Sequence, residues 1–161
     1  MRFTTITAAL VLMTTGAMAQ DLVEYGEMDG WAIMIDPTVG NGCLMQSDFE
    51  DGSSVRIGLN PAEGNGYVAA FNTAWGDVVD GTAYPVTFLL DEEKYEAEAT
   101  GMHMGDVPGV VIPFASEDFL ADIIVRNTMT LMSDETEVMV IELSGTNTAI
   151  DEVIACQDAQ G

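Results

Sequence analysis

The amino-acid sequence predicts an α+β fold, in which a mostly antiparallel β meander of about seven to nine strands is combined with two helices, one of them C-terminal, and closed by one disulfide. Three observations support this prediction. Short runs of alternating apolar and polar residues are interrupted by Gly, Asn and Asp about every eight to twelve residues. Two other segments carry apolar residues at helical spacing, and two cysteines lie far apart in the chain.

The N-terminal segment has the three parts of a secretory signal peptide, which we place at residues 1–19. A short positive start, Met1-Arg2, precedes the apolar run Ile6–Met13, and Ala17-Met18-Ala19 forms an A-x-A cleavage site before Gln20. A membrane anchor is disfavoured because the run is too short to cross about 30 Å of hydrocarbon. Cleavage leaves a single β-rich secreted domain, residues 20–161, in the bacterial periplasm or the medium.

Alternation and turn residues place the strands. Trp31, Ile33 and Ile35 alternate with smaller residues, and the polar segment 91–94 separates two such runs, which predicts a hairpin. Residues 64–69 match the G-x-G-x-x-A dinucleotide fingerprint by letters, but a strand-like segment follows where that fingerprint needs a helix, so we expect a turn. The expected strands are residues 31–36, 43–49, 54–59, 67–72, 84–90, 95–100, 109–114, 128–132 and 137–143.

The first helix is expected over residues 117–126, with Ser116 as its N-cap. The second lies near the C-terminus, where Thr148 and Asp151 resemble a capping box. Each helix has one apolar stripe, formed by Phe119, Leu120, Ile123 and Ile124 in the first and by Ala149, Ile150, Val153 and Ile154 in the second.

Cys43 and Cys156 predict a structural disulfide, because two distant cysteines outside a C-x-x-C motif are typical of an exported chain. A reactive thiol is the alternative, disfavoured because no His or Lys lies beside either cysteine to lower its pKa. Such a bridge closes a loop of roughly 100 residues and stabilises the fold by about 4–5 kcal/mol in the chain-entropy model. It would attach the last helix to the sheet.

The charge excludes one class of function. With 27 Asp and Glu against 4 Lys and Arg, the net charge is −23, and such a surface repels nucleic acid. The expected partner is an envelope protein or a cationic molecule. The acidic clusters at 48–52, 91–93 and 134–135 lack the spacing of an EF-hand, so we interpret them as solvated surface, with a Ca²⁺ site from scattered carboxylates as the alternative.

Met102, His103 and Met104 are the candidate metal ligands. Thioethers with an imidazole suit Cu(I), and the segment lies between two glycines. In a strand, however, His103 would point away from both methionines, so only a loop or a methionine from elsewhere could complete the site. The favoured interpretation is therefore a surface loop, with no cofactor.

No catalytic signature is present. His103 is the single histidine, and the nucleophile-elbow, H-E-x-x-H and P-loop motifs are missing from the sequence. A hydrolase that uses two carboxylates remains an alternative, because such pairs are set by space and not by sequence spacing. Trp31 and Trp75 could stack on sugars, but Trp31 lies in an alternating run and is expected in the core.

Structural residues along most of the mature chain carry a family resemblance. The first half has Trp31, Gly42-Cys43, Arg56-Ile57-Gly58 and Trp75, and the second half ends in Leu143–Thr146, Ala149-Ile150 and Val153 before Cys156. The chain thereby resembles small secreted bacterial proteins of uncharacterised function and, more distantly, the invasion-associated locus B type. The resemblance implies no catalytic residues. Together with the leader, it predicts a secreted or periplasmic acidic protein that acts by binding or as an envelope accessory, without enzymatic activity.

Overall fold

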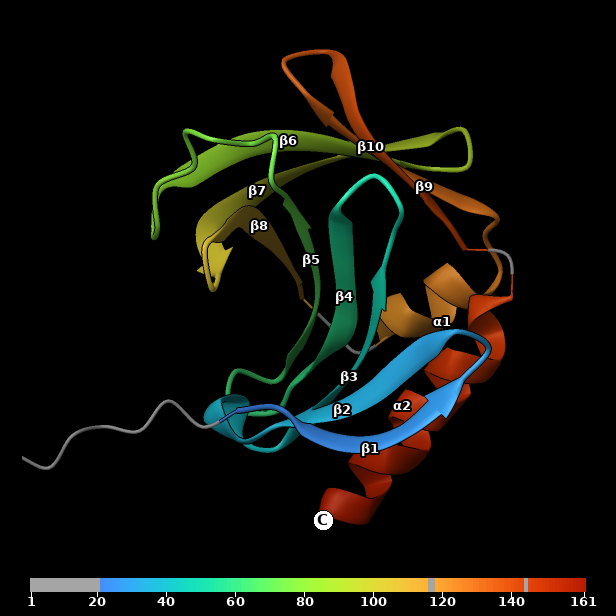
Figure 1. Ribbon diagram of the computed structural model, residues 1–161. Helices are drawn as coiled ribbons and strands as arrows, with labels where there is room; N and C mark the ends of the chain where they lie inside the picture. The colour runs from blue at the N-terminus through green and yellow to red at the C-terminus, as the bar shows by residue number, and fades with distance from the viewer. Residues whose placement is uncertain (1–20, 116–117, 144) are drawn as a thin grey trace, which may run out of the picture.

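The computed structural model describes residues 21–115, 118–143 and 145–161. These residues form ten strands, two α-helices and one short 3-10 helix (Figure 1). The strands are β1 (Val23–Met28), β2 (Trp31–Asp36), β3 (Gly42–Asp48), β4 (Ser53–Asn60), β5 (Asn65–Asn72), β6 (Ala83–Leu90), β7 (Glu93–Met104), β8 (Val107–Phe114), β9 (Thr128–Ser133) and β10 (Thr136–Glu142). The helices are η1 (Pro37–Val39), α1 (Asp118–Ile124) and α2 (Thr146–Gln160).

All ten strands belong to one antiparallel sheet, in the order β1-β2-β3-β4-β5-β8-β7-β6-β9-β10. The first five strands follow one another as a meander. The chain then leaves β5 for β6, and the β6-β7-β8 meander returns until β8 pairs with β5. Strand β9 pairs with the outer edge of β6, and β10 follows it. The predicted α+β class with a mostly antiparallel sheet is therefore confirmed.

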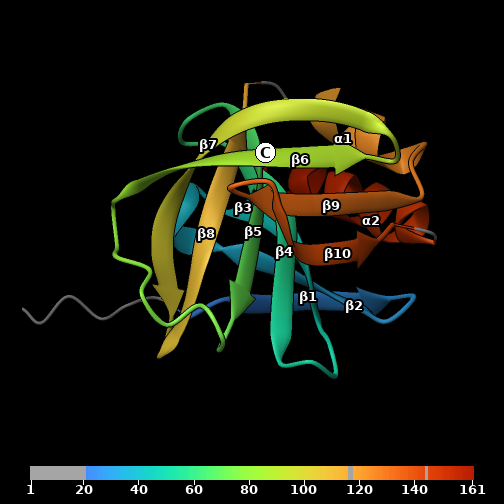
Figure 2. The same cartoon turned by 90° about the horizontal axis from the view of Figure 1, so that it is seen from above.

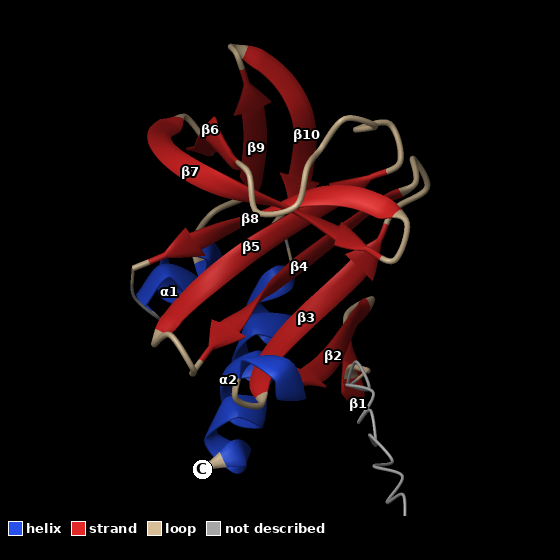
Figure 3. Ribbon diagram, turned by 90° about the vertical axis from the view of Figure 1, so that its left-hand side faces the viewer, coloured by secondary structure: helices blue, strands red, loops and turns tan. Residues whose placement is uncertain are grey.

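The sheet curls strongly, and the helices lie on its open side (Figures 1 and 3). Helix α2 packs on β1, β2 and β3 and also contacts α1. One hydrophobic core fills the inner face, because the alternating apolar residues of nearly every strand point to it. Seen from above, the strands at the two ends of the sheet run across the central ones (Figure 2).

The central strands are buried on both faces. In β4, Val55 and Ile57 face the core. On the opposite face Leu44 and Phe71 are also fully buried, outside the main hydrophobic cluster. Two glycines make room for them: a Cβ on Gly58 would lie 2.5 Å from the Leu44 Cβ, and one on Gly109 would lie 2.2 Å from the Phe71 ring.

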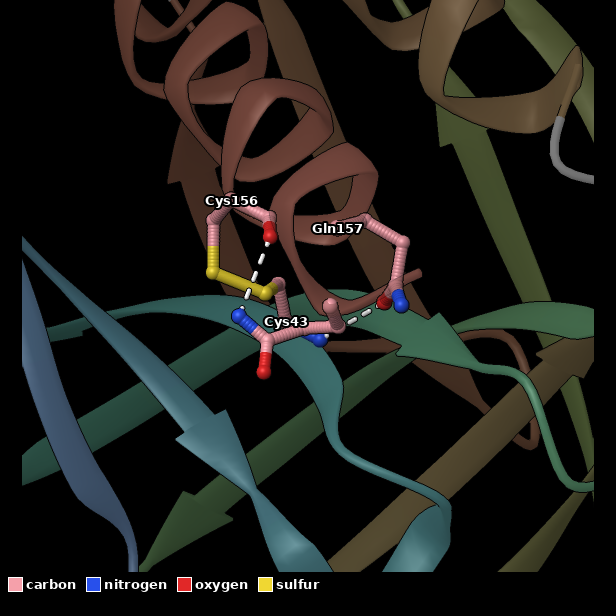
Figure 4. The surroundings of a disulfide bond; sticks show 4 residues. Cys43, Cys156 and Gln157 are labelled. Carbon is pink, nitrogen blue, oxygen red and sulfur yellow. Dashed lines mark hydrogen bonds between the residues drawn. A yellow bond between two sulfur atoms is a disulfide. The ribbon is translucent and has the colours of Figure 1, made fainter.

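The predicted disulfide is present. Cys43 on β3 and Cys156 on α2 are bridged across a sequence separation of 113, and both are fully buried (Figure 4). In the next position of the helix, the Gln157 side-chain oxygen accepts a hydrogen bond from the Cys43 backbone N–H at 2.9 Å. The last helix is thus joined to the sheet by a covalent bond and a neighbouring hydrogen bond.

Two local features differ from the sequence prediction, and two further predictions fall outside the described residues. Strand β1 was not predicted, because VEYGEM carries two acids and a glycine in place of a clear alternation. Helix α2 begins at Thr146, after Gly145 at φ 85°, so Thr148 lies inside the helix and donates to the Asp29 carboxylate instead of capping it. The proposed N-cap Ser116 and the predicted signal peptide lie outside the described residues.

All nine expected strands are present, the first with the expected ends and the others with shifted ends, and Trp31 is in the core with 7% of its surface exposed. Of the helical stripes, Leu120, Ile123, Ile150 and Val153 are buried as expected, whereas Ile154 is exposed. Across the ranges that the structure describes, neither helix has the length and apolar character that a membrane crossing requires.

Candidate functional site

An apolar pocket of about 370 Å³ lies between the segment 73–82, which connects β5 to β6, and the strands β6, β8, β9 and β10. Its floor is the edge of the core, formed by Val86, Val110 and Leu131, which are buried. Trp75 lines the pocket from the connecting segment and is half-buried. The volume lies at the lower end of the range of small-molecule sites, about 300–1,000 Å³.

The connecting segment is held in place by hydrogen bonds to β7. The Gly81 N–H donates to the Gly101 carbonyl at 2.9 Å, and the Gly101 N–H donates to the Thr82 carbonyl at 2.8 Å. Glycine is needed at 101, because a Cβ there would lie 2.3 Å from the Val79 carbonyl oxygen. The segment therefore packs directly on the backbone of β7.

Two side chains complete this attachment. His103 Nδ1 lies 2.6 Å from an Asp80 carboxylate oxygen, so the single histidine connects β7 to the segment. The Tyr84 hydroxyl accepts a hydrogen bond from the Val79 N–H at 3.0 Å, and the Tyr84 ring lines the pocket. The residues that border the pocket are therefore positioned before any ligand arrives, which reduces the entropy cost of binding.

The lining determines what the pocket can hold. Most of the lining side chains are apolar; Asp77 and Ser133 are polar, and Tyr84 carries a hydroxyl group. Such a site binds by excluding water from apolar surface and uses few polar groups for orientation. The sequence singles out Trp75 but does not predict an element for residues 73–82. The apolar pair Val78-Val79, outside any expected strand, was the sequence feature that could have indicated a buried segment here.

The three candidate metal ligands lie in β7 and not in a loop. His103 pairs with Asp80 on one face, whereas the Met104 sulfur accepts a hydrogen bond from Arg56 Nη2 at 3.0 Å on the other. Met102 shares the face of Met104 by strand alternation. Within residues 21–115, 118–143 and 145–161, no group of three or more His, Cys, Asp or Glu side chains is placed to hold a metal ion.

Copper binding by Met102, His103 and Met104 stays a prediction. Calorimetric titration with Cu(I) of the wild type and of His103→Ala tests it. Loss of binding in the variant would support the site, and binding to neither protein would contradict it.

Among the described residues, three carboxyl groups have pKa values shifted downward. Hydrogen bonds from Ser53 lower the pKa of Asp51, and backbone hydrogen bonds from Asn127 and Thr128 lower that of Asp91. A hydrogen bond from Arg126 lowers the pKa of Glu93. A carboxyl group that donates a proton in hydrolysis needs the opposite shift. The contacts of these three groups are hydrogen bonds made in turns and one ion pair.

Comparisons with known proteins gave a match for the fold. No family model matches the chain, and no curated protein does. Among solved structures, the chain is similar to the crystal structure of invasion associated protein B from Bartonella henselae, with a TM-score of 0.55 and 18% sequence identity over 86% of this chain and 99% of that chain. This likeness supports the resemblance to the locus B type at the level of the fold alone.

Proposed function

We propose that this chain is a secreted or periplasmic binding protein of the bacterial envelope, which acts without catalysis and takes a small apolar ligand into the pocket beside Trp75. The observation that carries the proposal is the pocket itself: an apolar cavity of about 370 Å³ whose floor is formed by core residues. A folded domain gains stability by filling such a space with its own side chains, so an apolar opening into the core favours a ligand.

The compartment is argued from three features. The sequence begins with the parts of a signal peptide, the disulfide between Cys43 and Cys156 suits an oxidising compartment, and the fold is similar to that of a bacterial protein. The strong negative charge keeps such a protein soluble and favours an envelope partner that carries positive charge.

Titration with 1-octanol, followed by ligand-observed NMR, tests the proposal. Ala74 lines the pocket and is exposed, so Ala74→Trp should fill the opening and weaken octanol binding by about tenfold or more. Ala159, exposed on α2, provides the matched control Ala159→Trp, which should bind octanol as the wild type does. Equal binding to both variants, or none to the wild type, would overturn the proposal.

A further inference from the structure

A second cavity lies on the face of the sheet opposite the core. This groove has a volume of about 340 Å³ and is bordered by side chains of β4, β5, β7 and β8. Arg56, between the core residues Val55 and Ile57, points into this opposite face by strand alternation. The groove is therefore separate from the pocket beside Trp75.

Arg56 is half-buried, and no carboxylate of the described residues forms an ion pair with it. Its Nε donates to the Gln46 side-chain oxygen at 2.7 Å, its Nη2 donates to the Met104 sulfur at 3.0 Å, and its Cζ lies 5.6 Å from the centre of the Phe71 ring. In the part of the chain that the structure describes, the ion pairs join His103 to Asp80 and Arg126 to Glu93.

This arrangement is unusual for a chain with 27 acidic and 4 basic residues, because nearly every cation could find a carboxylate. A guanidinium group has five N–H donors in a planar fork that matches a carboxylate. A neutral amide and a thioether take two of them, and both are weaker acceptors than a carboxylate. The other N–H donors of Arg56 are therefore available to a ligand in the groove.

Tyr67 supplies a second donor on the same groove. It is half-buried, and no hydrogen-bond partner for its hydroxyl exists among the described residues. Burial raises the pKa of this phenol, with the Asp36 carboxylate as a smaller cause in the same direction. The hydroxyl thus stays protonated and able to donate at neutral pH.

The rest of the groove sets the character of the ligand. Ala69, Met102 and Val111 give it an apolar wall. The carboxylates at its border are used locally: Asp36 accepts from the Thr38 N–H at 2.8 Å, and Glu63 accepts from the Asn65 amide at 3.2 Å. The negative charges of Asp36 and Glu63 repel a multiply charged anion such as phosphate more strongly than a singly charged carboxylate. The groove therefore favours one carboxylate beside the guanidinium group.

We propose that this groove binds a small monocarboxylate with an apolar body, whose carboxylate lies on Arg56 and Tyr67 and whose body lies on Ala69, Met102 and Val111. The acid replaces the missing ion-pair partner, and the apolar wall adds burial of hydrocarbon.

Octanoate is the probe, with inorganic phosphate as the anion that lacks an apolar body. Calorimetry should detect octanoate binding to the wild type and none of phosphate. Arg56→Gln should weaken octanoate binding by about 10- to 100-fold, because a hydrogen-bonded charge partner is lost. Tyr67→Phe should weaken it by a smaller factor, and melting curves of each variant establish that it is folded.

Two controls locate the binding. Lys94 is exposed, so Lys94→Gln makes the same change in net charge away from the groove and should bind octanoate as the wild type does. Ala74→Trp, which fills the other pocket, should leave octanoate binding unchanged. The proposal is overturned if the wild type fails to bind octanoate or if Ala74→Trp abolishes octanoate binding. It is also overturned if Arg56→Gln and Lys94→Gln weaken octanoate binding equally, or if neither Arg56→Gln nor Tyr67→Phe weakens it.

Discussion

At the scale of single residues, Asp91 joins segments that are far apart in the sequence. It lies in the turn between β6 and β7 at φ 53°, a conformation that Asp tolerates better than most residues. One carboxylate oxygen accepts the N–H groups of Asn127 at 2.9 Å and Thr128 at 3.1 Å, just where β9 begins. The Asp91 N–H donates in return to the Thr128 carbonyl at 2.9 Å. One turn residue thus fixes the start of another strand.

We expect Asp91→Ala to lower Tm by about 2–4 °C at pH 7, which is the size of shift that a lost hydrogen-bonded group causes in a domain of this size. The hydrogen bonds lower the pKa of Asp91 below 3.8, its ordinary value. The stabilisation is therefore fully present above that value and is lost as the pH falls through the folded-state pKa. Thermal melts of both proteins between pH 7 and pH 2.5 measure this, and a Tm difference that grows in acid would contradict the prediction.

At the scale of elements, the segment 73–82 depends on β7 for its position. The ion pair of His103 with Asp80 and the backbone hydrogen bonds of Gly101 with Gly81 and Thr82 act together to hold it over the apolar pocket. Because both partners are partly exposed, the ion pair stabilises weakly and its effect should be local.

We expect Asp80→Asn to raise the hydrogen-exchange rate of the Gly81 N–H by about two- to fivefold, since the segment opens more often when the ion pair is lost. Asp106→Asn, in the turn between β7 and β8, makes the same charge change and should leave that rate unaltered. Equal acceleration in both variants would indicate an effect of charge and not of the contact with His103.

The elements differ in how well the sequence predicts them. Residues 86–90 alternate between buried and half-buried positions, so the β6 pattern is visible from the residues alone. Gly101 within β7 and Gly105 just after it resemble the two ends of a loop, yet residues 100–104 pair with β8 after residues 93–100 have paired with β6. A strand that changes partners along its length cannot be recognised from local periodicity.

At the scale of the whole molecule, both cavities are made by strands that are distant in the chain. The pocket at Trp75 needs β8 and β10 on either side of β6, and the groove at Arg56 needs β8 between β5 and β7. Sequence reasoning identified Trp75 and Arg56 as parts of motifs, but it could not place them in cavities, because the returns of β8 to β5 and of β9 to β6 are set by packing. The Cys43–Cys156 bridge was predictable because only two cysteines exist.

That bridge should contribute much of the stability. We expect the double variant Cys43→Ala/Cys156→Ala to lose about 4–5 kcal/mol of unfolding free energy, because the bridge restricts the unfolded chain. Urea unfolding of the wild type, with and without a reductant, and of the double variant measures the loss. The reduced wild type serves as a control for the altered side chains, and stability that is the same in all three samples would contradict the prediction.

The net charge of −23 acts on the whole fold, since like charges are brought closer together when the chain becomes compact. Only two ion pairs join the described residues, so most acids have no neighbouring cation to offset this repulsion. Salt screens exposed charges, so that their interactions extend over about 10 Å at 0.1 M ionic strength and about 3 Å at 1 M.

We therefore expect Tm to rise between dilute buffer and 0.5 M NaCl, and to rise equally with KCl because the effect needs no specific ion. An equal concentration of uncharged sucrose is the control for general solvent exclusion. At pH 3 the carboxyl groups gain protons, so the rise in Tm caused by salt should disappear. The rise in Tm caused by sucrose should persist at pH 3. A Tm that is the same in dilute buffer and in salt at pH 7 would show that the acidic surface imposes no repulsive cost on the folded state.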